Sequence, residues 1–252
     1  MNEPNPSPPI PPIIPSGPRR PGDDPAEQAP ITSVVAAVES ILRQPRRVMY
    51  QLRQPGAGKV IAAMLAVAVL CSLVYGVVAG TFNGGAQLWA APVKIAGGLM
   101  ISGLICLPSL YIFTCLSGSQ ARLVEVFGLL AGLLMLMTIL LVGFAPVAWI
   151  FSQSTESPAW MGTLHLVFWF IATAFGLRFL KTGFAHTNAR SQAGINTWII
   201  IFLLVALQMT TALRPIIGKA DTFLPTEKKF FISHWVDCLR QPANTEKPKP
   251  GL

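Results

Sequence analysis

Residues 195–213 read INTWIIIFLLVALQMTTAL, a run of nineteen residues without a charged side chain. An α-helix rises about 1.5 Å per residue, so a run of this length matches the roughly 30 Å hydrocarbon core of a bilayer. The run is followed by Arg214, whose guanidinium can reach the headgroups, and by Pro215, which lacks the amide donor of a continuing helix. These residues predict a membrane-spanning helix that ends near residue 213.

The composition of the whole chain also indicates a membrane protein. Of its 252 residues, 52% are apolar and only 12% are charged, which lies outside the range of soluble globular proteins. The net charge is +8, but the basic residues stand beside apolar runs, so we interpret them as topology signals and contacts to anionic lipid. No nucleic-acid partner is expected. The four cysteines show no CxxC spacing, so neither a disulfide framework nor a zinc site is expected.

Four more apolar runs precede the first one described. The predicted spans cover residues 60–80, 95–116, 123–150, 160–180 and 196–213. The third run is longer than a bilayer requires and contains Pro146, which predicts a tilt or a kink. The expected fold is therefore all-α, a bundle of five transmembrane helices preceded by an amphipathic interfacial helix.

The amino-terminal region is rich in proline. The first 30 residues hold eleven of the chain's 22 prolines, which predicts a disordered, polyproline-like tail over residues 1–31. This tail can act as a spacer, or its PPIPPIIP segment can dock in an aromatic-lined groove of a partner. A basic stretch followed by an apolar stretch is missing, so we expect no signal peptide and assign insertion to the first span.

Residues 32–58 form the next region. Apolar side chains recur there at three- and four-residue spacing with a break near Pro45, which predicts two short amphipathic helices. Arg43, Arg46 and Arg47 lie on the opposite side, so we expect the segment to lie on an anionic leaflet and to contact lipid headgroups. The alternative is a cytosolic helix that packs on the loops. The remaining regions are the transmembrane domain at 59–217 and a tail at 218–252 with a short interfacial segment near 230–236.

The distribution of basic residues predicts the orientation. Lys and Arg occur before the first span, in the turn at 117–122 and in the segment 181–194, whereas 81–94 offers only Lys94 and 151–159 offers none. The positive-inside rule then places the amino terminus in the cytoplasm and the carboxyl terminus outside. We expect a multi-pass protein of the bacterial inner membrane.

Tryptophans near span ends are typical of membrane interfaces, where an amphipathic ring lies at headgroup level. With the predicted orientation, Trp89, Trp149 and Trp160 fall at the outer interface and Trp198 falls at the inner one.

Small residues recur at four-residue spacing within three of the spans. In lipid, such residues allow helix backbones to approach closely. We interpret this pattern as packing within one bundle, and the alternative is self-association. The candidate helix-packing residues are Gly76, Gly80, Gly98, Ser102, Gly128 and Gly132.

Ionisable residues at membrane depth are costly and often functional. Glu125 follows Arg122 by three residues, which favours an ion pair at the interface. His165 lies near the start of the fourth span, where it can be a hydrogen-bonded histidine or part of a proton relay. No span carries paired carboxylates, an HExxH motif or a serine with His and Asp partners, so we expect no enzyme, no catalytic residue, no cofactor and no metal.

The polar residues at the end of the fifth span are the remaining candidate site. Gln208, Thr211 and Arg214 follow one another at three-residue spacing. They form either a hydrogen-bonded helix interface or a polar pocket for a lipid headgroup.

Four segments carry a resemblance to a known family: ILRQPRR at 41–47, YGVVAGTFNGG at 75–85, LPSLYIF at 107–113 and QMTTALRPIIG at 208–218. Together they resemble a bacterial family of multi-span membrane proteins that is itself similar to the five-span Yip-domain family. The resemblance covers about residues 40–236 and implies a five-span fold without catalytic residues. The acidic-aromatic DLYGP-like motif of the eukaryotic Yip proteins is absent, and we do not transfer their role in vesicle traffic.

These observations favour a non-enzymatic scaffold or accessory subunit of a larger membrane complex. Its small-residue faces and loops are the expected contacts to other membrane proteins. The alternative is a transporter or binding protein for a lipid or small molecule that uses the polar site at the end of the fifth span.

Overall fold

The computed structural model describes residues 21–82, 84–85, 87–155, 158–185 and 193–212. These ranges contain helices and no strand. The three short helices are α1 (Pro25–Gln28), α2 (Val34–Arg43) and α3 (Pro45–Gln51). The long helices are α4 (Ala57–Thr81), α5 (Gln87–Leu116), α6 (Leu123–Ser154), α7 (Pro158–Ala185) and α8 (Ala193–Ala212).

All five long helices are long enough and apolar enough to cross a membrane. The predicted all-α fold and its five spans are therefore confirmed. The largest difference is at α5, which begins at Gln87 although the sequence predicted a loop up to residue 94. Pro92 lies inside the helix, as Pro108 does further on. Membrane helices tolerate proline because neighbouring groups compensate for the lost backbone hydrogen bond.

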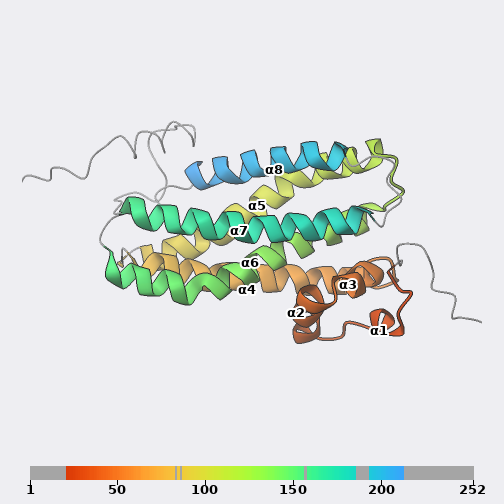
Figure 1. Ribbon diagram of the computed structural model, residues 1–252, viewed down its shortest axis with the longest axis horizontal. Coiled ribbons are helices and arrows are strands. Elements are labelled where there is room, and N and C mark those ends of the chain that lie inside the picture. The colour runs from red at the N-terminus through yellow and green to blue at the C-terminus, as the bar shows by residue number, and fades with distance from the viewer. Residues whose placement is uncertain (1–20, 83, 86, 156–157, 186–192, 213–252) are drawn as a thin grey trace, which may run out of the picture.

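The bundle is organised around α6, which contacts α4, α5 and α7. Figure 1 shows α4, α6 and α7 running along the long axis of the molecule, with α5 crossing them obliquely. At one end of the bundle α5 lies beside α4, and at the other end it lies beside α8. The helix α8 packs mainly against α5. Among the described residues, α5 is thus the main attachment of the last span to the bundle.

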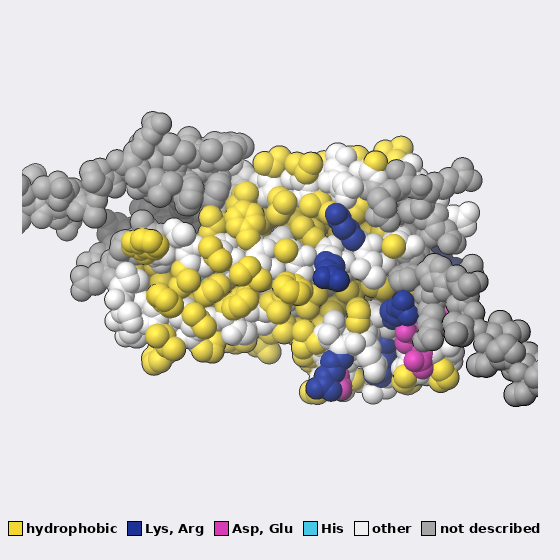
Figure 2. Space-filling model, viewed as in Figure 1, with side chains coloured by type: hydrophobic (Ala, Val, Ile, Leu, Met, Phe, Trp, Pro, Cys, Tyr) yellow, Lys and Arg dark blue, Asp and Glu magenta, His cyan; other side chains and the backbone are white. Residues whose placement is uncertain are grey.

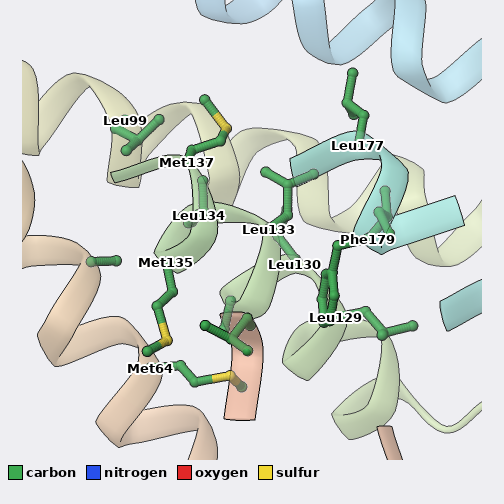
Figure 3. Close-up of a cluster of buried hydrophobic side chains, with 14 of the residues drawn as sticks. Met64, Leu99, Leu129, Leu130, Leu133, Leu134, Met135, Met137, Leu177 and Phe179 are labelled. Carbon is green, nitrogen blue, oxygen red and sulfur yellow. The ribbon is translucent and has the colours of Figure 1, made fainter. Parts of the chain in front are cut away.

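The core is formed by apolar side chains that α6 directs toward its neighbours. Leu130, Leu133 and Met135 are each almost completely buried. Figure 3 shows Met135 of α6 and Met64 of α4 with their side chains turned toward one another. In lipid the driving force for such packing is close contact between helices, because the tails of the lipid are as apolar as the side chains themselves.

The two predicted amphipathic helices are present as α2 and α3, and they are separated at Gln44 and Pro45 as predicted. Ser33 caps α2 by accepting a hydrogen bond from the amide of Ala36. Part of the apolar face of the two helices packs against protein, since Ile41 reaches Gly132. Val34, Val35 and Leu42 of α2 stay exposed. Contact of the segment with a lipid leaflet therefore stays a prediction.

The helices α2 and α3 pack on the bundle because α6 offers a groove that the sequence pattern did not reveal. Gly128 and Gly132 leave the surface of α6 open, and the side chains of Leu52 and Ile41 lie over them. Phe179 of α7 lies beside Ile41 at the same glycine. The pair α2–α3 therefore fills the space between α4 and α7 over the first half of α6.

Residues 21–31 were predicted to belong to a disordered tail, but in the structure they contact α3. The guanidinium of Arg47 donates hydrogen bonds to the carbonyls of Ala29 and Pro30, at 2.9 and 3.0 Å. Glu27 of α1 lies 4.0 Å from Arg46. The boundary of the predicted tail at residue 31 is thus too late. Residues 1–20 lie outside the described part of the chain.

Candidate functional site

The described polar groups of the spans meet at three places, and the first joins α4 to α7. The hydroxyl of Tyr75 lies 2.5 Å from Nδ1 of His165, and the two rings meet edge to face with centroids 5.5 Å apart. The interpretation of His165 as a hydrogen-bonded histidine is confirmed. Its Nε2 is buried and has no hydrogen-bond partner in the described part of the chain.

The same end of the bundle holds a lysine that the sequence had assigned to a loop. Lys94 lies in the second turn of α5 and is only 2% exposed. Next to it, α4 and α5 approach very closely, because a Cβ atom on Gly76 would lie 2.3 Å from Cα of Pro92. Lys94 is therefore part of the helix bundle and not of a loop.

The second polar contact joins α8 to α5. The indole N–H of Trp198 donates a 3.0 Å hydrogen bond to the carbonyl of Cys106, which also accepts a 2.8 Å bond from Ser109. Trp198 is completely buried and stacks on Phe202. Trp198 therefore lies in the core of the bundle and not on its outer surface, which the prediction of an interfacial tryptophan did not anticipate. Near a span end, an interfacial tryptophan and a core tryptophan have the same sequence pattern, and here Cys106 supplies the partner that a buried indole N–H requires.

The other three tryptophans lie near the ends of their helices, and their place at the outer interface stays a prediction. Trp89 is near the start of α5, Trp149 is near the end of α6 and Trp160 is near the start of α7. All three are exposed and lie at the same end of the bundle.

The third polar contact lies at the opposite end of the bundle, between the turn after α3 and the first turn of α6. A carboxylate oxygen of Glu125 lies 3.7 Å from Nε of Arg53. The predicted pair of Glu125 with Arg122 is therefore wrong. Docking of Leu52 on Gly128 brings Arg53 beside the first turn of α6, and helical spacing within α6 gave no sign of this contact.

The candidate helix-packing residues all lie inside the bundle. Each of them is buried: Gly76, Gly80, Gly98, Ser102, Gly128 and Gly132. Gly76 faces Pro92, and the two glycines of α6 face Leu52 and Phe179. These positions place the close approaches within one chain, which is the first of the two readings that the sequence allowed.

The three arginines expected to contact lipid headgroups are engaged with protein groups. Arg47 holds the carbonyls of Ala29 and Pro30, and Arg46 lies near Glu27. Arg43 lies 3.5 Å from Glu39 on the exposed side of α2. Of the three, Arg43 has the most exposed side chain, whereas Arg47 holds the segment before α2 through its two hydrogen bonds.

The candidate polar site at the end of the fifth span is described only in part. Gln208 is half-buried, and its amide oxygen is buried without a hydrogen-bond partner among the described residues. Thr211 belongs to α8, but its side chain lies outside the described part of the chain, as does Arg214. The interfacial segment predicted near 230–236 also lies outside it.

Two further findings concern the class of protein. Within the described ranges, no three His, Cys, Asp or Glu side chains lie together as ligands for a metal ion. Comparisons of the chain with protein-family models, with curated proteins and with solved structures found no match.

Proposed function

We propose that this protein is a non-enzymatic scaffold or accessory subunit that binds other membrane proteins through α8. The observation that carries the proposal is the attachment of α8 by one face only. Its buried stripe is formed by Ile195, Trp198, Phe202 and Ala206. The opposite side exposes Ile200 at 61% and Leu204 at 52%, and this side is open to a helix of a partner.

The hydroxyl groups of the spans support a structural role. Ser72, Ser102 and Thr114 are buried and donate hydrogen bonds to carbonyls four residues earlier in their own helices. Thr138 of α6 does the same. These side chains satisfy their polar groups within the helix while they allow neighbouring helices to pack closely.

We further propose that the protein lies in a bacterial inner membrane with its amino terminus in the cytoplasm. Figure 2 shows Lys and Arg side chains gathered toward the end of the bundle at which α2 and α3 lie, whereas the rest of the visible face of the spans is largely apolar. The positive-inside rule assigns such an end to the cytoplasm. The five spans are also the number that the resemblance to the Yip-like family implies, so we retain this kinship as part of the proposal.

Site-specific photocrosslinking in native membranes tests the role of α8. A photoreactive residue is placed at Ile200 or Leu204, and at Leu70 or Val74 of α4 as matched controls, which are 62% and 46% exposed. We expect one discrete protein adduct of constant mass from both α8 positions and none from the α4 positions. Adducts of equal yield from both helices, or no adduct from α8, contradict the proposal.

A second candidate function is binding or transport of a lipid or small polar molecule near the end of α8. It is favoured by the buried amide oxygen of Gln208, which has no hydrogen-bond partner among the described residues although such a group usually has a donor as partner. Gln208→Leu removes this group. If the site binds a ligand, Gln208→Leu lowers the amount of lipid or small molecule that co-purifies with the protein, whereas Leu204→Gln on the exposed side does not.

A further inference from the structure

Two basic residues lie near the carboxyl-terminal end of α7. Arg178 and Lys181 are three residues apart and are both exposed. Because α7 ends at Ala185, Arg178 lies seven residues inside the helix, which is about 10 Å from its end. Figure 2 shows that basic side chains on this face border on apolar ones. A cation at this depth must extend to the headgroups or find an anion.

The described part of the chain supplies no anion to this pair. Among the residues that the structure describes, no carboxylate lies within ion-pair distance of Arg178 or Lys181, whereas Arg43, Arg46 and Arg53 each have one. The nearby hydroxyl of Thr182 is used in a hydrogen bond to the backbone carbonyl of Arg178. The two cations are thus left for a ligand from outside the described chain.

An apolar track leads from this pair toward the centre of the span. Phe175 and Ile171 precede Arg178 by three and seven residues, so all three share one face of α7. Phe175 is 53% exposed and Ile171 is 39% exposed. The face therefore combines a cationic end near the headgroups with an apolar surface that follows the direction of a lipid tail.

We propose that Arg178 and Lys181 bind the phosphate of an anionic phospholipid whose acyl chain lies along Phe175 and Ile171. A guanidinium can form paired hydrogen bonds to a phosphate, and an ammonium adds a second charge. The apolar track favours a lipid over free phosphate. The site is independent of the proposed partner surface, because it lies on α7 and not on α8. It also differs from the arginines of α2 and α3, which have protein partners.

Native mass spectrometry of the full chain tests the proposal. The purified protein is titrated with phosphatidylglycerol and, separately, with phosphatidylcholine. We expect tighter binding of phosphatidylglycerol to the wild type. Loss of one charge, in Arg178→Gln or Lys181→Gln, should weaken binding of phosphatidylglycerol roughly fivefold, which is the usual contribution of one basic residue at an anionic surface. Loss of both charges in the double variant should weaken this binding about 25-fold. The matched control is Lys59→Gln with Arg122→Gln, two exposed cations at the ends of α4 and α6.

The further arms of the experiment separate a specific lipid site from general charge. Arg178→Lys with Lys181→Arg keeps both charges and should retain most of the binding, because the phosphate still meets two cations. The proposal is overturned if the double Gln variant binds like the wild type or if the control double variant loses as much. It is also overturned if millimolar inorganic phosphate displaces the lipid completely, because the site then recognises phosphate alone.

Discussion

The hydroxyl of Tyr75 contacts Nδ1 of His165 and so joins α4 to α7 across the face of α6. At the other end of the same face, Ile41 and Leu52 occupy the space between these two helices. The flanking helices α4 and α7 are therefore held on α6 by a hydrogen bond at one end and by an apolar wedge at the other. Among the described residues, α8 is attached mainly to α5.

Replacement of Tyr75 by Phe should weaken the link between α4 and α7. Hydrogen bonds between membrane helices contribute about 0.5 to 1.5 kcal/mol, so the free energy of unfolding should fall by this amount. A double-mutant cycle with His165→Ala, measured by unfolding in mixed micelles, isolates the pair. Strictly additive effects of the two substitutions would show that the contact contributes nothing.

Replacement of Trp198 by Ala should loosen α8. The substitution empties a fully buried site and removes the bond to the Cys106 carbonyl, so we expect a loss of about 3–5 kcal/mol in the free energy of unfolding. Trp160→Ala is the matched control because this side chain is 73% exposed. Equal effects of the two substitutions would contradict the assignment of Trp198 to the core.

Gly76→Ala should separate α4 from α5. The added Cβ would lie 2.3 Å from a backbone atom of Pro92, which cannot move like a flexible side chain. We therefore expect the free energy of unfolding to fall by about 1–3 kcal/mol. Gly97→Ala serves as control, since nothing lies within 4 Å of its Cβ position. It should leave the stability unchanged or raise it through better helix propensity. A neutral Gly76→Ala would mean that the two helices are further apart.

Leu52→Ala should release α2 and α3 from the bundle. Leu52 is 3% exposed and covers Gly128, so its truncation should lower the free energy of unfolding by about 2–5 kcal/mol. The control Leu42→Ala, at a 48% exposed position, should change this free energy little. A cysteine at Ala37, in a chain whose four native cysteines are replaced, reports the release. Maleimide should label it faster in Leu52→Ala than in Leu42→Ala. Identical labelling rates would argue against the docked position of α2.

The sequence predicted the elements of the fold better than their contacts. Span length and hydropathy are local properties, so all five spans and the break at Pro45 could be predicted. Which helix faces which depends on side chains far apart in the chain. His165 finds a partner 90 residues away, and Trp198 finds one 92 residues away.

The apolar faces of α2 and α3 illustrate the same limit. An amphipathic helix with arginines on one side has the same periodicity whether its apolar face meets lipid or protein. The deciding feature was the pair of glycines on α6, which the sequence had identified only as sites of close helix approach. Arg53 was missed as the partner of Glu125 because a three-residue spacing to Arg122 offered a local alternative.

Purification of the protein from its native membrane, followed by analysis of what co-purifies with it, tests the central claim that α8 binds a partner. The wild type is purified in a mild detergent, and its mass and constituents are compared with those of Ile200→Trp with Leu204→Trp and of the control Leu70→Trp with Val74→Trp. The account predicts a complex heavier than the 27.1 kDa chain that contains a second membrane protein in constant ratio, and this protein is lost only when α8 is changed. A particle built of this chain alone, with or without bound lipid, would contradict it.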